Sequence, residues 1–118
     1  MAGGRPSTYD PEFCELVINL GREGASKAEM AHACGVARMT LDNWANEHPE
    51  FLDAVTEAVQ LSQGWWESEG RKATFGKTPG FNATAFIFNM KNRFPADWRD
   101  KKEMDVNISH EDALEELE

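Results

Sequence analysis

Residues 26–46 read SKAEMAHACGVARMTLDNWAN, and this stretch predicts two short helices joined by one tight turn. Ser26 can cap the first helix, because its hydroxyl accepts from an amide of the first turn. Gly35 stands where the chain must leave that helix, since a residue without Cβ adopts the left-handed conformation at little cost. Leu41 and Trp44, three residues apart, give the second helix an apolar edge. The stretch is therefore typical of a helix-turn-helix.

A third helix is predicted before this motif. Asp10 and Pro11 stand in the usual order of a helix start, and apolar residues then recur at helical spacing up to Leu20. This helix would pack over the two helices of the motif. The predicted core of the resulting head consists of Phe13, Leu16, Val17, Leu20, Met30, Ala31, Cys34, Val36, Leu41 and Trp44. We expect this three-helix head to span residues 10–48.

The second helix of a helix-turn-helix presents its first residues and its outer face to DNA. Arg38 suits the edge of guanine and Asn43 that of adenine. Arg5 lies in a flexible arm, residues 1–9, whose Gly-Arg-Pro triplet resembles arms that enter an AT-rich minor groove. The predicted DNA-binding residues are Arg5, Lys27, Arg38, Met39, Thr40 and Asn43. The alternative is that they form a solvated helix face that serves packing or protein contact.

The distribution of charge predicts weak DNA binding by a single copy. The chain carries a net charge of -9. By segment, the net charge is -3 over residues 1–48, -3 over 49–75, +4 over 76–102 and -7 over 103–118. Neutralisation of phosphates supplies most non-specific affinity, so a mildly negative head should bind weakly. Several linked heads would still bind usefully through their high effective concentration.

Residues 49–100 predict a helical oligomerisation domain. A long helix is expected from Pro49 to Thr74, about 39 Å at 1.5 Å per residue. After the loop FGKTPGF, Asn82 can cap a second helix that ends before Pro95 and folds back onto the first as a hairpin.

Aromatic residues are concentrated in this domain. Eight of the chain's 12 aromatic residues lie between positions 65 and 98, more than the single seam of a helix hairpin can bury. We therefore expect copies of the chain to bury this surface against one another. The predicted oligomerisation residues are Val59, Trp65, Trp66, Phe86 and Met90. The alternative is that the head folds down over these rings.

Residues 101–118 predict an acidic tail. Apolar residues alternate from Met104 to Ile108, which indicates one strand that would form only by pairing with other subunits. Otherwise the charge of the tail favours disorder. Leu114 and Leu117 lie three residues apart among glutamates, so we interpret them as anchors for docking to a basic groove on a partner protein.

Composition excludes several classes of protein. With 41% hydrophobic and 28% charged residues, the chain is typical of globular proteins, and it contains neither a membrane-spanning run nor a visible signal peptide. Cys14 and Cys34 occupy apolar helical positions, which favours free thiols in a reducing cytoplasm. The three histidines lack metal-ligand spacing, and no arrangement of nucleophile and base is present. We therefore expect no metal, no cofactor and no enzymatic activity.

Three blocks of sequence, taken together, resemble the small subunit of a bacteriophage terminase. They are GRPS at 4–7, GVARMTLDNWANEHPEF at 35–51 and NRFPADWRDK at 92–101, and the resemblance covers about residues 4–102. It implies a non-enzymatic, all-α DNA-packaging protein of the host cytoplasm that assembles into a ring, usually an octamer or nonamer, with the heads outside. Such rings bind viral packaging-site double-stranded DNA and present it to the large terminase subunit, an ATPase and nuclease. The C-terminal segment contacts that subunit or the portal.

Two departures from the family pattern stand beside this resemblance. Ala37 occupies the position where Ser or Thr commonly caps the recognition helix, and the short tail puts a C-terminal barrel in doubt. The main alternative is a helix-turn-helix transcriptional regulator that binds an operator as a dimer, and a third is a scaffold whose head touches no DNA. The mass of the native assembly separates a ring from a dimer.

Overall fold

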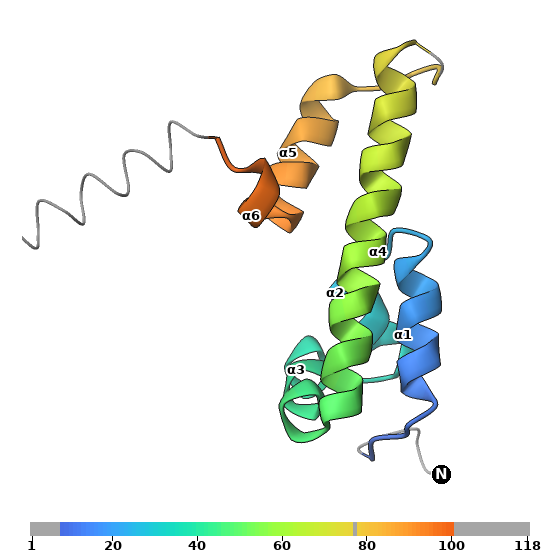
Figure 1. Cartoon of the computed structure of the whole chain (residues 1–118), viewed down its shortest axis with the longest axis vertical. Coiled ribbons are helices and arrows are strands. Elements are labelled where there is room, and N and C mark those ends of the chain that lie inside the picture. Colours follow the sequence, from blue (N-terminus) through green and yellow to red (C-terminus); the bar gives the residue numbers. More distant parts are fainter. Residues whose placement is uncertain (1–7, 77, 101–118) are drawn as a thin grey trace, which may run out of the picture. The chain divides into compact units, whose positions relative to one another are not determined.

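The computed structural model describes residues 8–76 and 78–100. In this part of the chain all secondary-structure elements are α-helices (Figure 1). The elements are α1 (Phe13–Gly21), α2 (Lys27–Ala33), α3 (Arg38–Glu47), α4 (Pro49–Thr74), α5 (Ala83–Arg93) and α6 (Pro95–Trp98). The predicted all-α class is thus confirmed. The predicted flexible arm up to Ser7, the tail with its strand, and Leu114 and Leu117 lie outside the described residues.

The chain divides into two compact units, Met1–Lys77 and Thr78–Glu118. The described helices of the first unit are α1 to α4, and those of the second are α5 and α6. The first unit extends well beyond His48, where we expected the head to end, because the first half of α4 shares a core with α1, α2 and α3. Packing of α5 on α4 as a hairpin stays a prediction.

Buried apolar side chains from all four helices form the core of the first unit. They are Val17, Met30, Ala31, Cys34, Leu41, Trp44, Ala45, Phe51, Ala54, Val55 and Ala58. The other predicted core residues, Phe13, Leu16, Leu20 and Val36, are half-buried and pack against this cluster. The Trp44 ring has three aromatic neighbours. It is stacked on Phe13 with centroids 5.5 Å apart, and it is edge-on to Tyr9 at 5.8 Å and to Phe51 at 6.1 Å. Helix α4 supplies four of these eleven residues, so it belongs to the core together with the three predicted helices.

Helices α1 and α4 run side by side in the same direction (Figure 1). Contacts follow that order, from Cys14 with Glu50 near the start of both helices to Gly21 with Ala58 further along. At Gly21 the two backbones approach so closely that an added Cβ would lie 2.3 Å from the Ala58 carbonyl oxygen. Only glycine fits at this crossing without a shift of one helix.

Ser26 and Asn82 cap their helices as predicted, whereas α1 begins at Phe13 rather than at Asp10 and Pro11, and its N-cap Glu12 makes no side-chain cap hydrogen bond. The Ser26 hydroxyl accepts from the Glu29 amide at 3.2 Å, and the Asn82 side chain accepts from the Ala85 amide at 2.9 Å. Gly35 has φ of 77°, and the next amide, of Val36, donates back to the α2 carbonyl of Ala31 at 3.0 Å. The turn between α2 and α3 is therefore set by local sequence.

Tyr9 ties the start of the described chain to the first turn of α4. Its ring stacks on His48 with centroids 3.9 Å apart, and its hydroxyl donates to Glu50 Oε2 at 2.9 Å. The same hydroxyl lies 3.3 Å from Cys14 Sγ. Burial, together with the hydrogen bonds to Cys14 and Glu50, raises the pKa of the Tyr9 hydroxyl, which therefore stays protonated.

Two further properties bear on the class of protein. None of the described helices, α4 included, has both the length and the apolar character that a bilayer crossing requires. Cys14 and Cys34 are free thiols, and burial raises the pKa of the Cys34 thiol to about 11. At neutral pH Cys34 is therefore a protonated, inert core residue.

Candidate nucleic-acid interface

Helix α3 has one buried face and one exposed face. Leu41, Trp44 and Ala45 fix it to the core of the first unit. Its opposite face, from the first residue onward, exposes Arg38, Met39 and Asn43. Residues three or four positions apart share a helix face, so Met39 lies beside Asn43 and Arg38 beside Asp42. A rigid helix thus presents a cation, an amide and a thioether to solvent.

The structure brings together only part of the predicted DNA-binding set. Arg38, Met39 and Asn43 share the exposed face of α3, whereas Thr40 is half-buried at its edge. Lys27 is the first residue of α2 and points toward Asp42 instead. Arg5 lies outside the described residues.

Lys27 and Asp42 form an ion pair, with Nζ and Oδ1 3.9 Å apart. Both side chains are more than a third exposed, so the pair contributes roughly 0–1 kcal/mol to stability. The pair also changes the charge of the surface. Lys27 offsets the negative charge of Asp42, which lies one turn after Arg38 on α3 and would otherwise repel a phosphate. The first unit as a whole, residues 1–77, carries twelve acidic and seven basic side chains, a net charge of -5.

Ala37 provides no side-chain cap for α3. Its backbone is extended, with φ of -76° and ψ of 158°, and no side chain accepts from the first-turn amides. Such amides are suited to phosphate oxygens, which a helix N-terminus also favours through its dipole. The departure from Ser or Thr at this position therefore leaves the start of α3 open to a DNA backbone.

Most of the predicted oligomerisation residues have contacts within their own chain. Trp66 Nε1 donates to the Gly24 carbonyl at 2.8 Å, and the Trp65 ring lies so close to Gly24 that an added Cβ would be 2.5 Å from Cε3. Val59 packs against the core of the first unit. Their role in oligomerisation stays a prediction.

In the second unit, the predicted residues also face inward. Met90 is fully buried, and the Phe86 ring lies edge-on to Trp98 with centroids 5.8 Å apart. The exposed apolar residues of α5 are instead Ile87 and Phe88. Phe88 falls off the stripe that Phe86 and Met90 define, so its exposure follows from the sequence, whereas Ile87 lies on that stripe, three residues before Met90.

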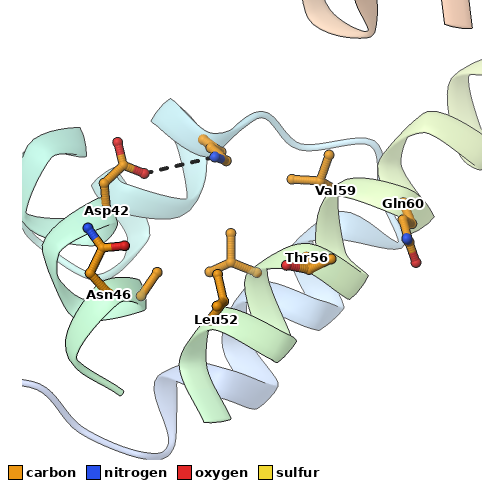
Figure 2. A pocket seen from close by; sticks show the side chains of 9 residues that line it. Asp42, Asn46, Leu52, Thr56, Val59 and Gln60 are labelled. Atoms are coloured by element: carbon orange, nitrogen blue, oxygen red, sulfur yellow. Dashed lines mark ion pairs between the residues drawn. The ribbon is translucent and has the colours of Figure 1, made fainter. Parts of the chain in front are cut away.

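A groove in the surface of the first unit was not predicted. It has a volume of about 460 Å³ and is lined by Lys27, Asp42, Ala45, Asn46, Leu52, Val55, Thr56, Val59 and Gln60. Figure 2 shows Asp42 and Asn46 on α3 facing Leu52, Thr56 and Val59 on α4, with the Lys27–Asp42 ion pair at one edge. Three helices contribute to it, which is why no single stretch of sequence indicates it.

Comparison with family models, curated proteins and solved structures found no match for this chain. Among the residues that the structure describes, no three His, Cys, Asp or Glu side chains are grouped as metal ligands would be. The features of the described chain that bear on function are the exposed face of α3 and the exposed apolar side chains of the two units.

Proposed function

We propose that this protein is the non-catalytic DNA-recognition component of a phage genome-packaging motor, a ring-forming terminase small subunit. The observation that carries the proposal is the exposed α3 face, where Arg38, Met39 and Asn43 project from a helix fixed by its buried side. A helix held in this way can enter the major groove, and its arginine and asparagine can bind base edges. The ring binds packaging-site DNA in the host cytoplasm and regulates the large terminase subunit.

The charge of the first unit supports multivalent rather than single-copy binding. With a net charge of -5 over residues 1–77, the first unit repels a polyanion, and Asp42 lies close to the proposed contact. One head therefore binds weakly and with strong dependence on salt, whereas a ring of heads gains affinity from effective concentration.

Arg38→Ala should remove sequence preference. We expect the free-energy difference between packaging-site DNA and an unrelated duplex to fall by about 1–3 kcal/mol, because a bidentate arginine–guanine contact is worth that much. Fluorescence anisotropy with the two labelled duplexes, at several salt concentrations, measures this difference.

Arg71→Ala is the matched control, since Arg71 is an exposed arginine in the last turn of α4. It makes the same change of charge away from α3 and should leave the preference intact. Equal effects of the two substitutions would mean that α3 does not read bases. A two-fold dimer that binds an operator would use the same α3 face, and a native mass of two chains would favour that second function.

A further inference from the structure

The exposed face of α3 has an apolar side chain at its centre. Each residue of an α-helix is rotated by about 100° from the one before, so Met39 lies almost directly opposite the buried stripe of α3. Its side chain is 74% exposed. Asn43 and Asn46 follow one and two turns later on the same face and are also exposed. The centre of the face is therefore a thioether beside two amides, and Arg38 lies nearer its edge.

The two asparagines of this face differ from the others in the described chain. Within residues 8–76 and 78–100, the side chains of the other asparagines each form a hydrogen bond to a protein atom, at Asn19, Asn82, Asn89 and Asn92. The side chains of Asn43 and Asn46 form none in this part of the chain. Each of these two amides therefore offers a donor and an acceptor to a ligand.

An A·T base pair matches this combination of groups in the major groove. Adenine presents the N7 acceptor beside the N6 amino group, and thymine presents its C5 methyl group. The Asn43 amide can donate from Nδ2 to N7 and accept at Oδ1 from the N6 amino group. A G·C pair has no methyl group, so it would leave the Met39 side chain without an apolar partner.

The spacing of the two side chains fits one base-pair step. Residues four positions apart on a helix have Cβ atoms about 5–6 Å apart. Stacked base pairs are about 3.4 Å apart, so Met39 can reach a thymine in the same pair as the adenine or in the next pair. Methionine is unbranched and has three rotatable bonds, which lets its side chain follow the surface of a methyl group.

We infer that α3 recognises A·T pairs through two side chains at once, with the Asn43 amide on the adenine edge and the Met39 thioether against a thymine methyl group. The inference rests on the proposed function and names the bases that this face selects beside the guanine assigned to Arg38. The contact removes from water an apolar side chain that is 74% exposed in the free protein. Met39 is thus a specificity-determining residue, whereas contacts to phosphates add affinity for every sequence.

Base analogues test each contact by changing single atoms of the DNA. The probe is the duplex that the wild-type protein selects from a randomised pool. Deoxyuridine in place of thymidine removes only the methyl group, and 7-deazaadenine in place of adenine removes only the N7 acceptor. We expect the wild type to bind the uracil duplex roughly fourfold more weakly for each methyl group contacted, as for one buried methyl-sized group.

Variants of α3 assign the two contacts. Met39→Ala should bind the thymine and uracil duplexes equally, whereas Met39→Leu should keep the difference, because leucine is apolar and of similar volume. Leu52→Ala is the matched control, since Leu52 is an apolar side chain of α4 that is 48% exposed, and it should also keep the difference. Asn43→Ala should lose discrimination against 7-deazaadenine and keep that against uracil. Melting curves of all four variants confirm that each is folded.

The outcomes separate the inference from the proposed function. A wild type that selects a duplex but binds its thymine and uracil forms equally would overturn the Met39 contact and leave DNA recognition by the ring standing. A selected duplex without a common A·T pair, or a uracil penalty that persists in Met39→Ala, would likewise overturn it. Equal binding of the adenine and 7-deazaadenine duplexes would overturn the Asn43 contact. A wild type that enriches no sequence from the pool would overturn both the inference and the proposed function.

Discussion

Gly21→Ala should lower the free energy of unfolding by at least 1–3 kcal/mol, the usual range for overpacking a tight interface. The added methyl group would lie 2.3 Å from the Ala58 carbonyl oxygen and 2.7 Å from its Cα. Both are backbone atoms of α4, so no rotamer change relieves the clash, and α1 must move away from α4. Each kcal/mol lowers the melting temperature of a domain of this size by about 4–8 °C. Denaturant and thermal unfolding curves measure the loss.

Gly64→Ala provides the control within α4. No atom lies within 4 Å of a Cβ built at Gly64, and its φ is not positive. The helix should therefore gain roughly 0.5–1 kcal/mol, because alanine loses less backbone entropy than glycine in a helix. If Gly21→Ala proved as stable as Gly64→Ala, the close crossing of α1 and α4 would be wrong.

Local features of the fold were predictable from sequence, because their causes lie within a few residues. Ser26 and Asn82 cap helices through amides three positions away, and Gly35 takes the left-handed conformation that ends α2. Val17, Met30 and Leu41 were placed in the core by helical spacing alone, and all are buried.

The partners of each helix were harder to predict. Periodicity marks Phe51, Val55 and Ala58 as one face of α4, but it does not say whether that face meets α1 or another subunit. The same uncertainty led us to assign Trp66 to oligomerisation, although it donates to Gly24 in its own chain. A contact between residues 42 positions apart leaves no local signal.

The candidate site also has one part that the sequence predicts and one part that it does not. The exposed residues of α3, Arg38 and Asn43, follow from the motif and from the buried stripe opposite them. The groove does not, because it requires the side chains of α3 and α4 at their observed distance. The structure also brings Tyr9 against Glu50, 41 positions away, and against His48 and Phe51, a contact that the sequence does not indicate.

Phe51→Ala should cost about 3–5 kcal/mol, as expected for truncation of a fully buried phenylalanine. The Phe51 ring contacts Trp44 of α3 and Tyr9, with centroids 6.1 Å and 5.4 Å away. Its loss leaves a cavity where three segments meet, so the α3 face should lose both rigidity and DNA binding. Phe75→Ala makes the same change at an exposed ring, and we expect an effect within about 0.5 kcal/mol.

A truncation tests whether α1 to α3 can fold without α4. A peptide of residues 1–48 contains the whole predicted head but lacks Phe51, Val55 and Ala58, which complete the core. It should therefore be unfolded by circular dichroism and amide exchange, whereas residues 1–77 should unfold cooperatively. Cooperative unfolding of the shorter peptide would restore the boundary at His48 and reduce α4 to an appendage. A shorter peptide that stays unfolded would mean that the exposed face of α3 and the α3–α4 groove belong to one folding unit, so a ligand bound at the groove would stabilise α3 as well.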